Sequence, residues 1–412
     1  MRRVTEQGAH RAAPGMALVA LLGLGAFIAN CAEADSSEDD ASPSVDASAG
    51  EDAGNDAGTF EDGRDAAVDA EVDACEASED GCAEPEWVPV ATGHSSGLGL
   101  SSVWGSGPND VWAVGAKGSV IHWDGTTWTS TPIDTNYSLQ SVYGTGPNDI
   151  WVVSTASLIY RSTGFSNGTA TFVRETPIFE NELGPASVGP LFAVWATGPG
   201  DVWISGKHRL AKAGQFETSW RTRPGDGGVG WTPLNTFGNT NVIYGIWGSG
   251  PNDVWMVGSK GTTTTSFASH TNGASAMDGG MPTWTELDTA TFSVLNSIWG
   301  TGPNDVWAVG NSGAIQHYTG GATWEGVDSP TSQNLRGVWA AAADDVWAVG
   351  ENGTILHYDG TEWKPSRAAL PKADQRHLYG VWGSGPADVW AVGDGIVLRY
   401  SGPQSGTHGD TK

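Results

Sequence analysis

The sequence predicts an all-β fold in which seven four-stranded sheets close into a ring, a seven-bladed β-propeller. Three observations predict it. A Trp-rich motif recurs seven times, successive copies start 39 to 52 residues apart, and each copy contains short apolar runs bounded by turn residues. A period of roughly 40–50 residues in strand-forming sequence is typical of propeller blades.

The repeating motif is clearest at 103–115, V-W-G-S-G-P-N-D-V-W-A-V-G, within the stretch Leu100–Trp128. Close copies occupy 246–258, 298–310 and 381–393, and looser copies occupy 142–154, 194–206 and 338–350. The leading aromatic residues are Trp104, Tyr143, Trp195, Trp247, Trp299, Trp339 and Trp382. Seven copies predict seven blades.

Four strands are expected in each copy, and in the first they begin at Leu100, Asp110, Ser119 and Trp128. Gly, Pro and Asn between the first two strands predict a tight turn. The second strand, V-W-A-V, is apolar on both faces, which is typical of a strand buried between two sheets. Because they recur at equivalent positions, we interpret the Asp that starts each second strand as a turn residue. We likewise interpret the shared His of the third strand as a blade residue and not a metal ligand. These residues are Asp110, Asp149, Asp201, Asp253, Asp305, Asp345 and Asp388, with His122, His317 and His357.

The last copy ends after its third strand, Ile396–Tyr400. The missing fourth strand is available at the other end of the chain, because Trp87–Ala91 resembles the fourth-strand segment Trp128–Pro132. Pairing of these two ends would close the ring and leave no open sheet edge there. We therefore expect the propeller to span 85–402, followed by a polar tail at 403–412.

Residues 1–30 are predicted to be an export signal of the lipoprotein type. Arginines precede the apolar run Met16–Ala29, which is too short to span a hydrocarbon core of ~30 Å comfortably. Ile28-Ala29-Asn30-Cys31 resembles the bacterial lipoprotein signal, which implies lipidation of Cys31 and an anchor in the outer membrane of the cell envelope. Three alternatives stay open: an ordinary cleaved signal, which would give a secreted protein; a lone buried cysteine at Cys31; and Met16 in place of Met1 as the true start.

Residues 31–84 are rich in Asp and Ala and nearly free of large apolar side chains, so we expect a disordered acidic tether. Cys75 and Cys82 form an even pair in an exported chain, which favours a disulfide over a metal site. The net charge of −27, without a basic stripe, argues against nucleic-acid binding.

Three insertions, at 162–189, 213–230 and 262–282, are the candidate binding loops, because function often lies on loops carried by a rigid frame. As loops between third and fourth strands they would lie on one side of the ring. Tolerated surface variation is the alternative. The candidate side chains are Phe165, Arg174, Phe179, Phe216, Trp220, Arg221, Arg223 and His270.

The seven VWG-GPND-VWAVG units resemble the Trp-rich repeats of exported bacterial propeller lipoproteins of the myxobacterial type. More distantly they resemble photosystem II assembly factor propellers and the Asp-box (BNR) propellers of sialidases; Asp124-Gly-Thr-Thr-Trp128 approximates an Asp-box. Sialidase activity would imply an arginine cluster and a tyrosine nucleophile, yet the F/Y-R-I-P segment is absent and the arginines are scattered. The sequence also lacks a G-x-S-x-G elbow, H-E-x-x-H and a phosphate loop.

The combined expectation is a monomeric, membrane-tethered binding or scaffolding module for protein or glycan, without enzymatic activity, cofactor or metal. Two other functions stay open. One is a glycoside hydrolase or lyase with its site at the central channel, and the other is an assembly or adhesion factor of the cell envelope.

Overall fold

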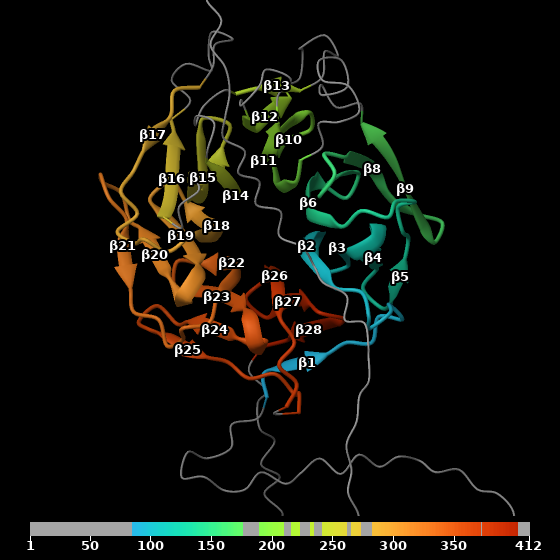
Figure 1. Cartoon of the computed structure of the whole chain (residues 1–412). Coiled ribbons are helices and arrows are strands. Elements are labelled where there is room, and N and C mark those ends of the chain that lie inside the picture. Colours follow the sequence, from blue (N-terminus) through green and yellow to red (C-terminus); the bar gives the residue numbers. More distant parts are fainter. Residues whose placement is uncertain are drawn as a thin grey trace, which may run out of the picture. The chain divides into compact units, whose positions relative to one another are not determined.

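The computed structural model describes residues 85–175, 189–209, 216–222, 231–234, 241–261, 265–272, 282–371 and 373–402. These residues form a ring of seven four-stranded antiparallel sheets (Figure 1), which confirms the predicted all-β seven-bladed propeller. The predicted signal, tether and tail, with Cys31, Cys75 and Cys82, lie outside the described residues. In the described ranges no helix is long and apolar enough to cross a membrane.

The blades follow the order of the chain. Blade 1 consists of β2 (Leu100–Gly107), β3 (Asp110–Gly115), β4 (Val120–Trp123) and β5 (Trp128–Ser130). Blade 2 consists of β6 (Leu139–Gly146), β7 (Asp149–Ser154), β8 (Ile159–Ser166) and β9 (Thr169–Glu175). Blade 3 consists of β10 (Leu191–Gly198), β11 (Asp201–Arg209), β12 (Phe216–Thr222) and β13 (Thr232–Pro233). Blade 4 consists of β14 (Val242–Gly250), β15 (Asp253–Lys260), β16 (Thr265–Thr271) and β17 (Thr285–Glu286).

The remaining blades repeat this arrangement. Blade 5 consists of β18 (Leu295–Gly302), β19 (Asp305–Gly310), β20 (Ile315–Tyr318) and β21 (Glu325–Val327). Blade 6 consists of β22 (Leu335–Ala342), β23 (Asp345–Gly350), β24 (Ile355–Tyr358) and β25 (Trp363–Pro365). Blade 7 consists of β26 (Leu378–Gly385), β27 (Asp388–Gly393), β28 (Ile396–Tyr400) and the N-terminal β1 (Trp87–Pro89).

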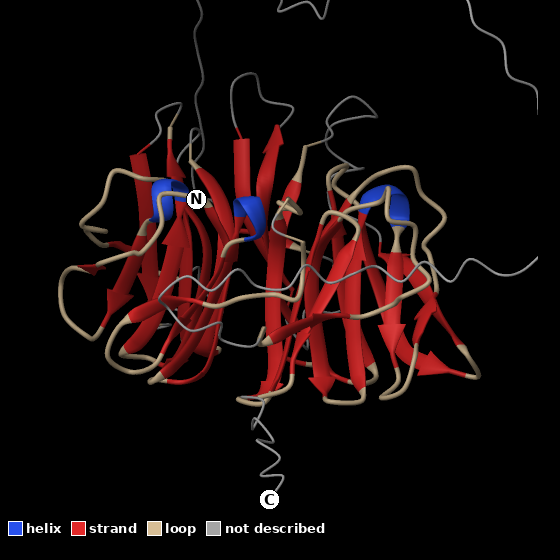
Figure 2. Cartoon of the chain, turned by 90° about the horizontal axis from the view of Figure 1, so that it is seen from below, coloured by secondary structure: helices blue, strands red, loops and turns tan. Residues whose placement is uncertain are grey.

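The ring has two rims. The hairpin rim carries the turns between first and second strands and between third and fourth strands. The link rim carries the links between blades and the second-to-third turns, including the short helical turns η1 (Ala116–Gly118), η4 (Asn311–Gly313) and η5 (Glu351–Gly353), which lie along one side of the ring in Figure 2. Contrary to expectation, the predicted insertions do not all join third to fourth strands: 223–230 and 273–281 do, but 176–188 follows the fourth strand of blade 2, and 210–215 and 262–264 stand between second and third strands.

Tryptophan contacts hold neighbouring blades together. The second-strand Trp of each blade meets, edge to face, an aromatic residue from the fourth strand of the next blade or from just before it, an arrangement that aromatic rings favour. The pairs are Trp112–Phe172, Trp151–Trp231, Trp203–Trp284, Trp255–Trp324, Trp307–Trp363, Trp347–Trp87 and Trp390–Trp128, with ring centroids 5.1–6.1 Å apart and ring planes inclined by 79–89°. The same contact recurs at all seven interfaces, which explains why the motif is so constant.

A second contact joins the first strands. At five of the seven interfaces the ring of the leading Trp covers the Gly that follows the leading aromatic residue of the next blade, as Trp339 covers Gly383 and Trp104 covers Gly144. A Cβ at these glycines would lie 2.5–2.7 Å from the nearest indole atom in all five blades that have Gly here. Blades 3 and 6 have Ala196 and Ala340 instead. The preceding leading aromatics, Tyr143 and Trp299, are the two of the seven that are only partly buried.

The N-terminal strand closes the ring as predicted. β1 pairs antiparallel with β28 in the register Trp87↔Tyr400 and Pro89↔Leu398. Trp87 is fully buried against Trp347 and Tyr400. The backbone carbonyl of Trp87 also accepts a hydrogen bond from the Ala369 N–H at 2.8 Å, so the same strand is tied to the link after blade 6.

Candidate binding site at the central channel

The first strands of all seven blades line the central channel. Four-residue or three-residue segments of each, such as Ser101–Trp104 and Tyr379–Trp382, enclose a cavity of about 190 Å³. On the link rim the cavity widens into a mouth of about 660 Å³, which Ala116, Asn311 and Asp394 of the second-to-third turns also line. A mouth of this size lies in the range of small-ligand and peptide side-chain sites.

A β-bulge in every first strand supplies the side chains of this mouth. In β2 the pairing with β3 shifts between Leu100 and Ser102, which leaves Ser101 as an extra residue, and the same shift recurs in the other six blades. An extra residue in a strand is unpaired and turns its side chain away from the regular alternation. The seven bulge residues, here called the bulge ring, are Ser101, Gln140, Phe192, Tyr244, Asn296, Arg336 and Tyr379, and all seven line the mouth.

The bulge ring differs from blade to blade, whereas its neighbours hardly change. The residue before it is Leu or Ile in every blade, and the residue after it is Ser, Ala or Gly. Constant positions serve the packing that all blades share, so a variable position in the same strand is free to serve one site. The sequence therefore contained a signal for this ring, which a comparison limited to the conserved letters of the repeat overlooks.

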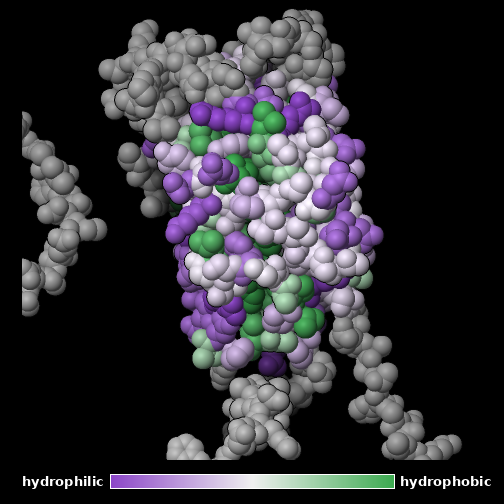
Figure 3. All heavy atoms as spheres, turned by 90° about the vertical axis from the view of Figure 1, so that its right-hand side faces the viewer, coloured by the Kyte–Doolittle hydropathy of each residue, from purple (hydrophilic) through white to green (hydrophobic). Residues whose placement is uncertain are grey.

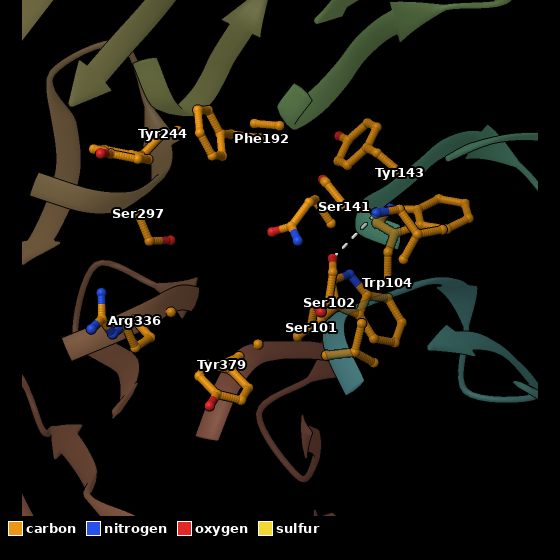
Figure 4. A pocket seen from close by; sticks show the side chains of 18 of the residues that line it. Ser101, Ser102, Trp104, Ser141, Tyr143, Phe192, Tyr244, Ser297, Arg336 and Tyr379 are labelled. Atoms are coloured by element: carbon orange, nitrogen blue, oxygen red, sulfur yellow. Dashed lines mark hydrogen bonds between the residues drawn. The ribbon is translucent and has the colours of Figure 1, made fainter. Parts of the chain in front are cut away.

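The bulge ring contains an aromatic side and a polar side (Figure 4). Phe192 and Tyr244 are neighbours, with ring centroids 5.0 Å apart and planes inclined by 59°. Asn296 Nδ2 donates hydrogen bonds to Asn311 Oδ1 at 2.9 Å and to the Leu335 carbonyl at 2.8 Å. The amide of Asn296 is thus held in place by its neighbours, while the aromatic side offers apolar surface.

Charged groups lie beside the polar side. Arg336 Nη2 donates to Glu351 Oε1, and Asn334 Nδ2 donates to Glu351 Oε2 at 2.9 Å. The hydrogen bond from Arg336 is the main cause that lowers the pKa of Glu351, so this carboxylate stays ionised. Tyr379 OH donates to Asp394 Oδ2 at 3.4 Å. Burial, and next the charge of Asp394, raise the pKa of Tyr379.

The repeated Asp residues lie near the hairpin rim and hold their own blades together. Asp110 accepts hydrogen bonds from Ser106 at 2.6 Å and Trp112 at 3.0 Å, and its Oδ1 lies 2.7 Å from His122 Nε2. The other blades repeat the contact with His or Arg from the third strand, as in Asp388–Arg399. Within the described part of the chain no three His, Cys, Asp or Glu gather as metal ligands would. These carboxylates are structural, as expected from their repetition.

Several candidate side chains of the insertions serve the frame of the ring. Trp220 is 2% exposed and packs among the apolar residues between blades 2 and 3. Arg221 is 5% exposed, and its charge is paired there: its Nε and Nη2 donate hydrogen bonds to the two oxygens of Asp201, and its guanidinium lies over the ring of Trp203. His270 contacts Asp253 and stacks on Trp255. All three are third-strand residues, whose side chains pack between blades.

The β8–β9 hairpin of blade 2 reaches over the neighbouring blade. Phe165 stacks on His122 of blade 1 with ring centroids 4.1 Å apart, and Thr131 Oγ1 donates to the Ala170 carbonyl at 2.9 Å. Arg174 lies exposed on β9. Figure 3 shows one side of the ring, where polar residues surround small hydrophobic patches. Phe216 begins β12, and Phe179 and Arg223 lie outside the described residues.

No family model matches this sequence, and no curated protein matches it. Among solved structures the chain is similar to YCF48 bound to D1 peptide, with a TM-score of 0.57, 19% identity, and coverage of 78% of this chain and 96% of that one. It is similar to YCF48 from Cyanidioschyzon merolae, with a TM-score of 0.55, 20% identity, and coverage of 76% and 98%. The WD40 β-propeller domain of Doa1 follows, with a TM-score of 0.51, 11% identity, and coverage of 77% and 96%. The expected likeness to photosystem II assembly factor propellers is thus confirmed for the fold.

Proposed function

We propose that this protein is a binding module that captures an extended protein segment at the link-rim mouth of its channel. The bulge ring carries this proposal: one residue from each of seven blades converges on one cavity, and only that position of the first strand varies freely. Aromatic, amide, hydroxyl and guanidinium groups in one ring are suited to recognition of a side chain that enters the mouth from the link rim. The fold supports this use, since one of the similar solved structures is YCF48 bound to D1 peptide.

The cellular setting is part of the same proposal. The propeller would be a monomer of the exported bacterial lipoprotein type, held at the outer membrane by a lipid on Cys31 through the acidic tether at 31–84. β1 begins at the hairpin rim, where Trp87 pairs with Tyr400 at the end of β28. A tether that precedes β1 would therefore be attached to the ring at the rim opposite the mouth.

The proposed role is non-enzymatic. Among the described residues the channel and its mouth contain one arginine, Arg336, whereas Arg161, Arg221 and Arg399 pair with the repeated Asp residues. A sialidase-like reaction would need several arginines around one substrate carboxylate, so this dispersal gives the glycoside hydrolase alternative no support. An envelope assembly or adhesion factor remains compatible, because such a factor would also act by binding.

The test compares two ligand classes on the full-length protein, purified in detergent. A random-peptide display screen and a glycan array are run with the wild-type protein and two variants. Ser101→Trp adds a large side chain inside the mouth, and Ser130→Trp adds the same side chain on the exposed outer strand β5. We expect peptides whose binding is lost in Ser101→Trp and kept in Ser130→Trp. Peptide binding that survives Ser101→Trp, or binding of glycans alone, would contradict the proposal.

A further inference from the structure

The mouth carries one charge that has no ion-pair partner among the described residues, that of Asp394. Asp394 lies in the turn between β27 and β28, where its backbone N–H donates to the His377 carbonyl at 3.0 Å. From the described residues its side chain accepts one hydrogen bond, the long one from Tyr379 OH at 3.4 Å. The other ionic group of the lining, Arg336, is neutralised by Glu351. The mouth is therefore negative by about one charge.

One aromatic ring lies beside this charge, and two lie farther off across the mouth. Tyr379 adjoins Asp394, and Tyr244 with Phe192 lies across the opening in Figure 4. The faces of aromatic rings attract cations, and a cation that also meets a carboxylate gains a charge-assisted hydrogen bond. Asp394 also raises the pKa of Tyr379, after burial, as expected where the local potential is negative.

We propose that the mouth selects a lysine or arginine side chain of the bound segment, with its charged end between Asp394 and Tyr379 and its apolar stem against Tyr244 and Phe192. This inference rests on the proposed function, because it names the side chain that the captured segment presents. Capture of an acidic side chain by Arg336 is disfavoured, since Glu351 and the captured carboxylate would compete for one guanidinium. The net charge of −27 would also attract basic segments from a distance.

The probe is a library of acetylated and amidated octapeptides in which one position is fixed as Arg, Lys, citrulline, Leu or Glu and the others vary. Citrulline keeps the shape of arginine and removes its charge, so the Arg-to-citrulline ratio isolates the charge. Enrichment is measured on the full-length protein at two salt concentrations, because a paired charge weakens as salt rises. We expect Arg and Lys to be enriched about tenfold over citrulline, the factor that about 1.4 kcal/mol of pairing produces.

Three variants locate the preference. Asp394→Asn keeps the shape of the side chain, and we expect it to remove the Arg-to-citrulline ratio. Asp134→Asn removes the same charge from an exposed residue of the link between blades 1 and 2, and we expect the ratio to persist. Tyr379→Leu should reduce the ratio by at least threefold while Leu-fixed peptides still bind. Thermal unfolding of each variant confirms that it is folded.

The outcomes separate this inference from the proposed function. Two outcomes overturn the inference and leave the proposed function standing. In the first, binding depends on an open mouth but shows no preference for Arg and Lys. In the second, binding prefers Glu and loses this preference in Arg336→Gln. Library binding that Ser101→Trp does not reduce overturns the function itself. A preference for Arg and Lys that Asp394→Asn retains overturns the assignment to this carboxylate.

Discussion

The contact between Trp339 and Gly383 allows a quantitative test of how the blades fit together. In Gly383→Ala the new Cβ would lie 2.6 Å from Trp339 Cη2 and 2.8 Å from the Asp388 carbonyl oxygen. Real Cβ atoms do not approach this closely, so both the indole of Trp339 and the backbone at Asp388 must shift. Overpacking of this kind costs about 1–3 kcal/mol. The added methyl group recovers about 0.4–1 kcal/mol by restricting the unfolded chain.

The net expectation for Gly383→Ala is a loss of about 1–2 kcal/mol in the free energy of unfolding, or about 2–3 °C in Tm for a domain of this size. Blades 2 and 3 supply the compensating change, since Tyr143 precedes Ala196 there. Trp339→Tyr combined with Gly383→Ala should therefore be more stable than the sum of the two single changes predicts, by at least about 0.5 kcal/mol.

Guanidinium unfolding followed by far-ultraviolet circular dichroism measures all four proteins of this cycle. A Gly383→Ala protein as stable as the wild type would refute the proposed contact. Strictly additive effects of Trp339→Tyr and Gly383→Ala would refute the idea that a smaller aromatic ring accommodates Ala in place of Gly. Ala340→Gly is the matched control. Because Trp299 is already partly exposed, removing this methyl group relieves no clash, and the change should not stabilise the protein.

Three further predictions concern ring closure, pH and the β8–β9 hairpin. Trp87→Ala should lower the free energy of unfolding by about 3–5 kcal/mol, because it empties a fully buried site at the closing strand; guanidinium unfolding measures this. Burial alone would raise the pKa of Asp110, but hydrogen bonds from His122 and Ser106 lower this pKa below its usual value. The stability that Asp110 contributes is therefore present above about pH 4 and is lost as the pH falls through the folded-state pKa. Asp110→Asn should accordingly flatten Tm against pH below about pH 4. Phe165→Ala should cost about 1–3 kcal/mol and increase proteolysis of the hairpin, because Phe165 covers His122.

Each of these predictions has a control. Val88→Ala, next to Trp87 but 47% exposed, should change stability by less than about 0.5 kcal/mol. Asp134→Asn should leave the pH profile unchanged, and an equal flattening in both Asn variants would show that the effect is one of net charge. Val173→Ala, at a residue 62% exposed on β9, should leave proteolysis unchanged; if it matches Phe165→Ala, the hairpin is held by something other than the stacking contact.

The fold was predictable because its signal is repeated. Seven copies of one motif average out local ambiguity, and the fourth-strand character of Trp87 was visible by comparison with Trp128. The first strands nevertheless run longer than expected, to Gly107 in blade 1, because the segment read as a turn continues the pairing with β3. A turn signal marks where the chain reverses, and it does not mark how far the strands pair before that point.

The candidate site was less predictable. Aromatic residues in an insertion resemble a binding surface. Trp220, however, occupies a regular third-strand position, paired with Ile204 as Ile121 is paired with Ala113, and Phe165 lies at the end of the long strand β8; both pack against neighbouring blades. The bulge ring could not be predicted from one strand alone, because a bulge is a property of the pairing between two strands and the sequence of one strand shows no extra residue. Variation among copies at Ser101 and its equivalents was the available signal, and it requires aligning the repeats for their differences.

The closing strand also sets an order on folding. Trp87 is made first, but its partner Tyr400 is made last, so β1 must stay unpaired until nearly the whole propeller has emerged. Joining two segments so far apart in the chain is entropically costly in an unfolded chain, and the cost falls only as the intervening blades stack and bring the ends together. Closure is thus the last step of folding, and it depends on the correct stacking of every blade. A chain in which one blade has failed to stack cannot bring β28 to β1, so both sheet edges stay unpaired and accessible to proteases.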